Sequence, residues 1–170
     1  MKEIDFRRDL LPHKDKLFRL ALRIVLQRSE AEDIVQETLV RAWERREALT
    51  QVESLEGYLI TVCRNLALDN REKKENSNLS LGDAELELPA SDISPQERLE
   101  REEKLQRVHR LFNQLPEKQR TIMHLRDIEG LSYQETAQAL GITEDIVRVT
   151  LHRARAAIRK AFEKEENYGL

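Results

Sequence analysis

Apolar positions in the first part of the chain repeat every three to four residues, which is the period of an α-helix that buries one face. The clearest run begins at Ser29, where Ser29 and Glu32 have the spacing of a capping box at a helix start. One side of this helix is apolar or small: Ala31, Ile34, Val35, Thr38, Leu39, Ala42 and Trp43. We predict an amphipathic helix over 29–44, with Trp43 as the last residue of its buried stripe.

The same periodicity on either side of this run predicts two more helices. Residues 10–26 and 55–71 each carry a stripe of aliphatic side chains, and the polar stretch 45–54 is expected to be a loop. We therefore expect the first part of the chain to fold as a helical bundle. Cys63 lies on the third stripe, which favours a buried, inert thiol over a redox switch.

The last part of the chain has the pattern of a helix-turn-helix. Ser132 and Glu135 form a second predicted capping box, Gly141 stands where a positive-φ turn is needed, and Thr143 can cap the next helix. That helix has a buried stripe of Val147, Leu151, Ala154 and Ile158. A short helix, a glycine-containing turn and a longer helix form the arrangement that places a recognition helix in the major groove of DNA.

Two further helices, over 105–115 and 118–127, are predicted before this motif, separated at Pro116. Between the two helical parts, residues 76–100 hold six anions, one cation, four serines and two of the four prolines. We predict an all-α protein of two small helical domains, 1–75 and 101–170, joined by a flexible acidic linker over 76–100. At the end of the linker, Ser94, Pro95 and Glu97 have the spacing of a helix start.

Charge supports a nucleic-acid contact at the last helix. The 170 residues carry 29 Lys and Arg and 32 Asp and Glu, a net charge of −3. Residues 146–160 nevertheless hold five cations and no anion: Arg148, Arg153, Arg155, Arg159 and Lys160. A basic helix on a nearly neutral protein suits phosphate binding, although a merely solvated helix face would have the same composition.

Composition and motifs exclude several classes of protein. One cysteine forms neither an internal disulfide nor a Cys-rich metal site, and no apolar run approaches the ~18 residues of a membrane helix. The first residues lack the apolar core of a signal peptide. There is no glycine-rich phosphate loop or nucleophile elbow, and the four histidines lack metal-ligand spacing. We predict a cytoplasmic protein that is not an enzyme, with no metal and no cofactor.

Three blocks resemble the bacterial RNA polymerase sigma factors of the extracytoplasmic-function type, in the sigma-70 family. They are Ala31–Trp43, Tyr58–Asp69, and the set Leu115–Arg120, Gly130–Ala137 and Leu151–Arg155. The resemblance implies a transcription initiation factor that binds core RNA polymerase, recognises the −10 and −35 promoter elements and assists promoter melting. It also implies an anti-sigma factor as a partner, which in many family members is anchored in the membrane.

By this resemblance the first block binds core polymerase and the second meets the −10 element. The polymerase candidates, which lie off the apolar stripe, are Asp33, Gln36 and Glu37. The −10 candidates are Tyr58, Arg64, Asn65 and Arg71, together with the loop 45–54, which would capture a flipped base. Tyr58 stands where many relatives have Trp, and Asn65 suits a structural hydrogen bond as well as a DNA contact.

The third block is implied to read the −35 element. Many relatives have Thr-Val-Lys-Ser-Arg where this chain has Ile146-Val147-Arg148-Val149-Thr150. Arg148 is expected to pair with a guanine or a phosphate, and Val149 and Thr150 to offer methyl groups to thymine. Arg153 and Arg155 are expected to bind phosphate or to pack their stems on the domain.

Two other functions fit the same helices. A conventional helix-turn-helix repressor or activator would use the first domain to sense a ligand or to dimerise on a palindromic site. A helical adaptor would have no salt-dependent affinity for nucleic acid. The sigma-type function instead predicts a free monomer that binds core polymerase and promoter DNA and does not insert into a membrane.

Overall fold

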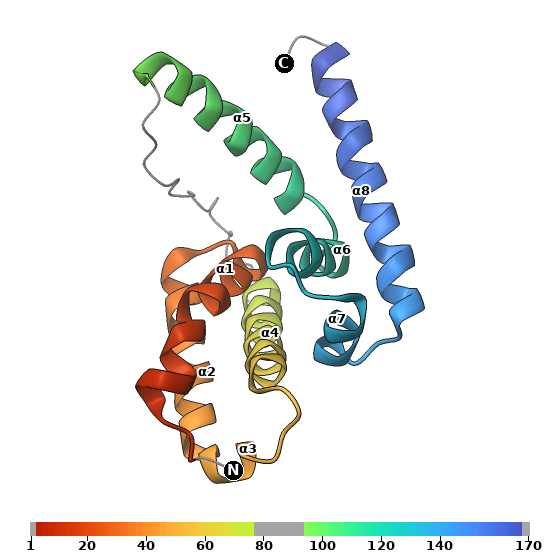
Figure 1. Cartoon of the computed structure of the whole chain (residues 1–170). Helices are drawn as coiled ribbons and strands as arrows, with labels where there is room; N and C mark the ends of the chain where they lie inside the picture. Colours follow the sequence, from red (N-terminus) through yellow and green to blue (C-terminus); the bar gives the residue numbers. More distant parts are fainter. Residues whose placement is uncertain (1–2, 77–93, 168–170) are drawn as a thin grey trace.

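The computed structural model describes residues 3–76 and 94–167, and within these two ranges all regular structure is helical (Figure 1). The predicted all-α fold is thus confirmed. In chain order the elements are η1 (Phe6–Leu10), η2 (Leu11–His13), α1 (Lys14–Val25), α2 (Arg28–Glu44), α3 (Arg46–Leu49), α4 (Leu55–Asn76), α5 (Pro95–Asn113), α6 (Glu117–Met123), η3 (His124–Ile128), α7 (Tyr133–Leu140) and α8 (Glu144–Asn167).

Helices α1, α2 and α4 pack against one another and bury the predicted aliphatic stripes. Leu17, Leu20, Ile24, Leu39 and Leu59 are among the fully or nearly fully buried side chains of this core. Each burial of such a side chain contributes roughly 1.5–3 kcal/mol, so this core holds the three helices together. Cys63 is also buried there, and burial raises the pKa of its thiol to about 12, as an inert cysteine requires.

The start of α2 differs from the prediction. The helix begins at Arg28, and its N-cap residue, Gln27, makes no side-chain capping hydrogen bond, so Ser29 lies inside the first turn. The start is set by Leu26, whose left-handed φ of 61° turns the chain between α1 and α2. Ala31 then donates its backbone N–H to the Gln27 carbonyl at 3.0 Å, which closes the first turn.

The end of α2 also differs, because Trp43 is 38% exposed and does not lie in the core. Its ring meets Phe6 of η1 edge-on, with 5.9 Å between ring centroids, and the guanidinium of Arg46 lies 4.2 Å from its centroid. Both partners lie outside α1 and α4, in the N-terminal segment and in the short helix that follows α2, which meet at the same end of the bundle. The predicted loop 45–54 also contains the short helix α3, because Leu49 is buried in the core.

The helix-turn-helix is formed as predicted by α7, the turn and α8. Ser132 accepts from the Glu135 backbone N–H at 3.0 Å while Glu135 accepts from that of Ser132 at 2.9 Å. Gly141 has φ 66°, a conformation that L side chains rarely adopt, and Thr143 caps α8 through the Ile146 N–H. Val147, Leu151 and Ala154 on the inner face of α8 are buried, whereas Ile158, the last residue of the predicted stripe, is only half-buried.

Residues 77–93 of the predicted linker lie outside the described residues. At the end of that segment, 95–100 form the first turns of α5. Ser94 caps α5 by accepting the Glu97 N–H at 3.2 Å, as the spacing predicted. Helices α5 and α8 diverge away from the rest of the molecule in Figure 1.

The N-terminal and C-terminal helices share an interface. Helices α6 and α7 and the turn η3 pack against α1 and α4, and Leu125, Leu131 and Ala139 join the core of the N-terminal bundle. We call this packing the closed arrangement. It brings together side chains that lie 53 to 110 residues apart in the chain, and it decides which candidate residues are accessible.

Candidate functional site

The polymerase candidates lie together on the outer face of α2. Asp33, Gln36 and Glu37 are all exposed, while Ile34, Val35, Thr38 and Leu39 on the opposite face are buried. Glu37 accepts from Arg41 at 2.9 Å one turn later. Val40, 49% exposed, continues the same face with an apolar side chain. The helix thus presents a mainly polar surface that no other described element covers.

The four −10 candidates on α4 have different environments. Asn65 is exposed, whereas Tyr58 is half-buried against the N-terminal core. Arg64 is mostly buried and pairs with Glu117 of α6, with 3.8 Å between Arg64 Nε and Glu117 Oε1. Arg71 donates to the Ile24 carbonyl of α1 at 3.4 Å. Arg64 is therefore engaged across the interface of the closed arrangement, whereas Arg71 is engaged within the N-terminal bundle itself.

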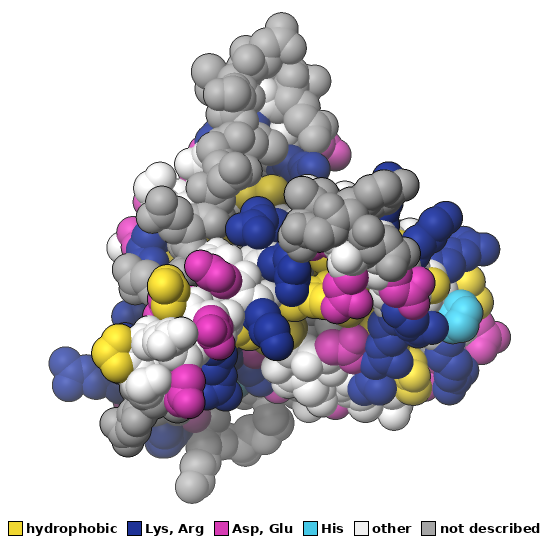
Figure 2. All heavy atoms as spheres, turned by 90° about the horizontal axis from the view of Figure 1, so that it is seen from above, with side chains coloured by type: hydrophobic (Ala, Val, Ile, Leu, Met, Phe, Trp, Pro, Cys, Tyr) yellow, Lys and Arg dark blue, Asp and Glu magenta, His cyan; other side chains and the backbone are white. Residues whose placement is uncertain are grey.

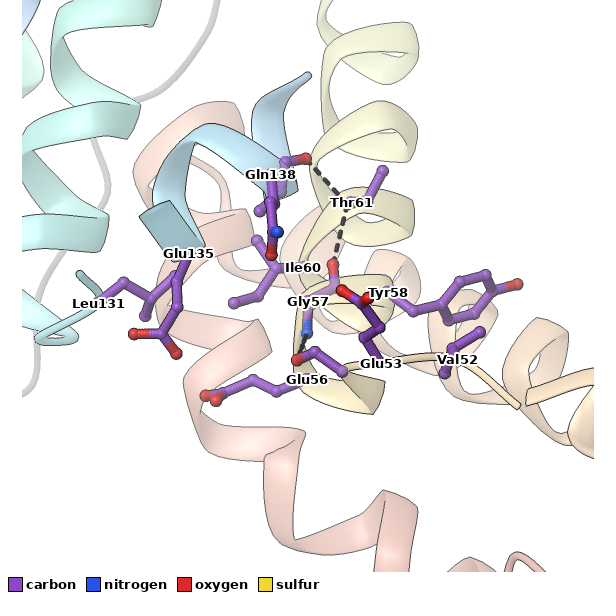
Figure 3. Close-up of a pocket in the computed structure, with 12 residues that line it drawn as sticks. Val52, Glu53, Glu56, Gly57, Tyr58, Ile60, Thr61, Leu131, Glu135 and Gln138 are labelled. Atoms are coloured by element: carbon purple, nitrogen blue, oxygen red, sulfur yellow. Dashed lines mark hydrogen bonds between the residues drawn. The ribbon is translucent and has the colours of Figure 1, made fainter. Parts of the chain in front are cut away.

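A cleft of about 410 Å³ lies between the start of α4 and α7 (Figure 3). Val52, Glu53 and Tyr58 line it from the N-terminal side, and Glu135 and Gln138 from α7. Thr61 of α4 lies in the wall of the cleft, and its hydroxyl donates to the Ala139 carbonyl of α7 at 2.8 Å. The helix α7 therefore stands directly beside the loop that is implied to receive a flipped −10 base.

The −35 candidates lie on α8. Arg148, Val149 and Arg153 are exposed, and Thr150 is half-buried. Arg148 donates to Asp145 at 3.1 Å, and Arg155 forms a bidentate pair with Asp127 of η3. Basic side chains gather in Figure 2 on the side where α8 lies in Figure 1. Arg155 is thus fixed by Asp127 within the C-terminal helices, while Arg148 and Arg153 face solvent.

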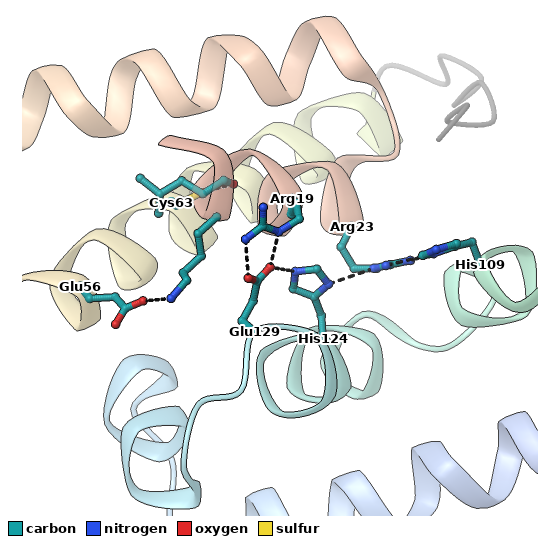
Figure 4. Close-up of polar contacts among 9 residues, drawn as sticks. Arg19, Arg23, Glu56, Cys63, His109, His124 and Glu129 are labelled. Atoms are coloured by element: carbon teal, nitrogen blue, oxygen red, sulfur yellow. Dashed lines mark hydrogen bonds and ion pairs between the residues drawn. The ribbon is translucent and has the colours of Figure 1, made fainter. Parts of the chain in front are cut away.

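A chain of polar side chains crosses the interface of the closed arrangement (Figure 4). Arg19 of α1 forms two hydrogen bonds to Glu129, at 2.8 and 2.9 Å. Glu129 pairs in turn with His124 Nε2 at 2.9 Å. Arg23 Nε donates to His124 Nδ1 at 3.2 Å, and its other nitrogens contact His109 Nδ1 at the same distance.

These contacts fix the protonation states. Since Nδ1 of His124 accepts from Arg23, its proton is on Nε2 and points to Glu129, so the ring is neutral. Burial, together with the Arg23 charge, lowers the pKa of His124, and the same two causes lower that of His109 to about 4. Burial alone would raise the pKa of Glu129, but hydrogen bonds from His124 and Arg19 outweigh it and lower the pKa to about 2.

Two buried arginines make further hydrogen bonds across this interface. Arg120 of α6 is 1% exposed and donates to the Ile24 carbonyl of α1 at 3.1 Å and to the Asn113 carbonyl at 2.9 Å. Arg23 also donates to the Asn113 side chain at 3.1 Å, and its guanidinium lies 4.1 Å from the centroid of the Phe112 ring. Burial, followed by repulsion from a neighbouring arginine, lowers the pKa of both to about 10, so both remain charged at neutral pH.

Sequence reasoning did not identify this network. One signal was present: Arg23 lies three residues after Leu20 and one before Ile24, so a cation occupies the edge of an apolar stripe. His124 likewise follows Arg120 by one helical turn. Neither spacing says which distant segment supplies the partner, and that information came from the fold.

The described residues show no group of three or more His, Cys, Asp or Glu that could hold a metal ion. Nor does any helix in 3–76 or 94–167 combine the length and apolarity needed to cross a membrane. What the described chain does contain is an all-helical fold, a helix-turn-helix with an exposed basic face, and a separate exposed polar face on α2. Together these features define an all-helical protein of the helix-turn-helix class, the class in which a recognition helix enters the major groove of DNA.

Comparisons with known proteins narrow this class. Residues 11–76 match the family description "Sigma-70 region 2", and residues 105–158 match "Sigma-70, region 4". The chain is 30% identical over 159 residues to the ECF RNA polymerase sigma factor SigW of Bacillus subtilis, covering 87% of this chain and 83% of that one. It is 31% identical over 156 residues to SigE of Mycolicibacterium smegmatis, covering 91% of this chain but only 60% of the relative.

The fold agrees with a solved structure, the sigma factor RpoE in complex with the anti-sigma factor NepR from Bartonella quintana. The TM-score is 0.76 at 24% identity, over 94% of this chain and 97% of that one. The chain belongs to the sigma-70 family of RNA polymerase sigma factors and is of the extracytoplasmic-function type. It is therefore a promoter-specific transcription initiation factor. The members of this family are initiation factors and not enzymes.

Proposed function

We propose that the chain directs core RNA polymerase to a specific set of promoters through three parts with separate tasks. Residues 1–75 bind core polymerase and the −10 element, 76–100 connect, and 101–170 read the −35 element. The protein acts in the cytoplasm and catalyses no reaction itself. The observation that carries this proposal is the exposed basic face of α8, presented by a correctly capped helix-turn-helix in a chain whose two ends match two sigma regions.

The outer face of α2 is the surface for core polymerase. Asp33, Gln36 and Glu37 are exposed together there, at a spacing that places them on one face of the helix. Their carboxylates and amide suit a partner that offers basic or polar side chains. Substitution of Asp33 and Glu37 by their amides keeps the shape of this face and removes its charge, so loss of polymerase binding in that variant supports the assignment.

The surface of α4 meets the −10 element after the closed arrangement opens. Tyr58 and Asn65 are partly or fully accessible, but Arg64 and Arg71 make internal contacts. For Arg64 to reach DNA, its pair with Glu117 must break, which requires α6 to move away from α4. Polymerase binding supplies the driving force for this separation if its surface favours the open form.

On α8, Arg148 pairs with a guanine or a phosphate, and Val149 and Thr150 contact thymine methyl groups. Arg148 and Val149 are exposed in the first two turns of the helix, the part that enters the major groove in this motif. Arg153 contacts phosphate and so positions the helix without specifying sequence. Arg155 stabilises the unit through Asp127, and any phosphate contact it makes competes with that pair.

An anti-sigma protein is the proposed inhibitory partner, and the free chain is proposed to be a monomer. The similar RpoE structure contains the anti-sigma factor NepR, which supports the existence of such a partner here. A monomer also separates this function from that of a conventional helix-turn-helix regulator, which binds palindromic sites as a dimer.

The decisive experiment is abortive transcription with bacterial core polymerase and a library of promoter templates. Initiation that depends on the chain and selects defined −10 and −35 sequences supports the proposal. Binding to a palindromic site without association with core polymerase would instead indicate a conventional repressor or activator. An Asp33→Asn/Glu37→Gln variant should fail to initiate while still binding duplex −35 DNA, which separates the two surfaces.

A further inference from the structure

Tyr133 lies between two arginines that come from different elements. It is the first residue of α7, and its ring centroid is 4.1 Å from the guanidinium carbon of Arg126 in η3. The guanidinium carbon of Arg148 on α8 is 5.0 Å from the same centroid. Both distances are within the range of a cation–π contact. The ring therefore connects the turn before the helix-turn-helix to the exposed face of α8.

The ring itself is held in place. Its backbone starts α7 and is fixed by the reciprocal capping bonds of Ser132 and Glu135. Its side chain is half-buried and packs against the cluster that includes Val147 and Leu151 of α8. On the other side, Arg126 is anchored because it donates to the Leu131 carbonyl. The ring thus has little freedom of its own.

Arg148 is the most exposed member of this set. Its side chain is 52% exposed and reaches out from the second turn of α8. Besides the Tyr133 ring, Arg148 contacts Asp145, which accepts from Nη1 at 3.1 Å and is itself 91% exposed. An exposed pair three residues apart on a helix is weak and does little to restrict an arginine. The Tyr133 ring, unlike the exposed Asp145 carboxylate, is held by its own packing and offers the guanidinium a fixed contact.

We propose that Tyr133 is a positioning residue for Arg148: its ring holds the guanidinium in the orientation that reads the −35 element. This inference rests on the proposed function, in which Arg148 contacts DNA. A planar guanidinium that pairs with one base must be aligned, and an unrestrained arginine loses much rotamer freedom when it binds. A ring that restricts the side chain before binding lowers this entropic cost and sharpens discrimination between bases.

The test compares Tyr133→Phe, Tyr133→Leu, Arg148→Ala and the double variant Tyr133→Leu/Arg148→Ala in the full chain. Fluorescence anisotropy at fixed salt measures affinity for a duplex carrying the −35 sequence selected in the transcription assay and for duplexes changed at each base pair. We expect Arg148→Ala to lose at least about fivefold discrimination at one pair. Tyr133→Leu should lose part of the discrimination at that same pair, Tyr133→Phe should retain it, and the double variant should match Arg148→Ala.

A second measurement does not depend on DNA. NMR relaxation of the Arg148 side-chain Nε–H in the free protein should show greater mobility in Tyr133→Leu than in Tyr133→Phe. If Tyr133→Leu fails to fold, Tyr133→Met, which keeps an unbranched apolar side chain without a ring, replaces it in both assays.

Three results would overturn the proposal. Unchanged discrimination in Tyr133→Leu, with a clear loss in Arg148→Ala, refutes positioning and leaves the role of Arg148 intact. Equal weakening on every duplex, additive with Arg148→Ala, indicates that the ring only stabilises the fold. If Arg148→Ala changes discrimination at no base pair, Arg148 does not read the −35 element. The proposed positioning role of Tyr133 is then refuted as well.

Discussion

Arg64 of α4 and Glu117 of α6 form an ion pair across the closed arrangement, with 3.8 Å between Nε and Oε1 and about four-fifths of each side chain buried. The first residue is a candidate −10 contact, and the second belongs to the segment that precedes the helix-turn-helix. One pair therefore links the accessibility of the −10 surface to the position of the C-terminal helices. The sigma factor cannot offer Arg64 to DNA and keep this contact at the same time.

Weakening the Arg64–Glu117 pair should make the candidate −10 residues more accessible. Glu117→Gln removes the charge but keeps an oxygen that accepts from the Thr121 hydroxyl, as Glu117 does at 2.7 Å. Partly exposed ion pairs contribute about 0.2–1 kcal/mol, so we expect affinity for a single-stranded −10 oligonucleotide to rise by a factor of up to about five. Anisotropy measures it, with the exposed Glu100→Gln on α5 as the control. Equal affinity in both variants would mean that Glu117 does not restrict Arg64.

Acid should open the closed arrangement. His109 and His124 both accept hydrogen bonds from Arg23, and burial lowers both pKa values, that of His109 to about 4 from an ordinary 6.5. Between these pH values the closed form binds fewer protons than the open form. Its stability is therefore complete above about pH 6.5 and declines as the pH falls towards 4. Glu129, with a pKa of about 2, stays ionised throughout and does not reverse the sign.

Small-angle scattering between pH 7.5 and 5 measures this opening as an increase in the radius of gyration. A His109→Gln variant keeps an acceptor for Arg23 and cannot take up the proton, so its response to pH should be smaller. The exposed His152→Gln is the matched control and should behave as the original chain does. A radius of gyration independent of pH in all three proteins would contradict the prediction.

Substitutions on the two faces of α8 should affect stability and sequence preference separately. Leu151→Ala truncates a side chain that is 2% exposed beneath α8 and should lower the free energy of unfolding by about 2–5 kcal/mol. Val149→Ala, two residues away and 49% exposed, should change stability by less than about 0.5 kcal/mol. Urea unfolding followed by circular dichroism measures both. Val149→Ala should nevertheless alter the −35 sequences selected in transcription, and an unaltered selection would remove Val149 from the reading surface.

Cys63 should be unreactive in the folded chain. Its thiol is fully buried under α1, where it contacts the Leu17 carbonyl at 3.5 Å, and its pKa is raised to about 12. At pH 7.5 almost no thiolate forms, and the reagent has no access. Iodoacetamide should label Cys63 only after denaturation, and mass spectrometry measures the extent of labelling. Rapid labelling of the native protein would show that α1 and α4 separate readily.

Local sequence pattern was sufficient for much of this protein. The helices, the capping box at Ser132, the positive φ at Gly141 and the buried stripe of α8 follow from side chains within a few turns of one another. The exposed faces of α2 and α8 follow from the same periodicity, because a helix that buries one side exposes the other. The resemblance to sigma factors rested on these local blocks and was confirmed.

The predictions that failed depended on distant contacts or on backbone geometry without a side-chain signature. Ser29 is not the cap of α2 because Leu26, an ordinary leucine, adopts a left-handed conformation. Trp43 continues an apolar stripe, but it is 38% exposed and its ring meets Phe6 and Arg46 outside the core. The predicted loop contains α3 because Leu49 finds a place in a core built from other helices.

The amino-acid sequence alone thus determined the all-helical class, the helix-turn-helix and the identity of the candidate surfaces, since each is encoded over short separations. Only the tertiary structure decided that Arg64 is paired with Glu117, 53 residues away, and that Arg23 meets His124, 101 residues away. A charged side chain shows in sequence that it needs a partner when buried, but not where that partner lies. Packing of α6, η3 and α7 on α1 and α4 supplies the partners, and so determines which of the candidate DNA-binding residues are accessible.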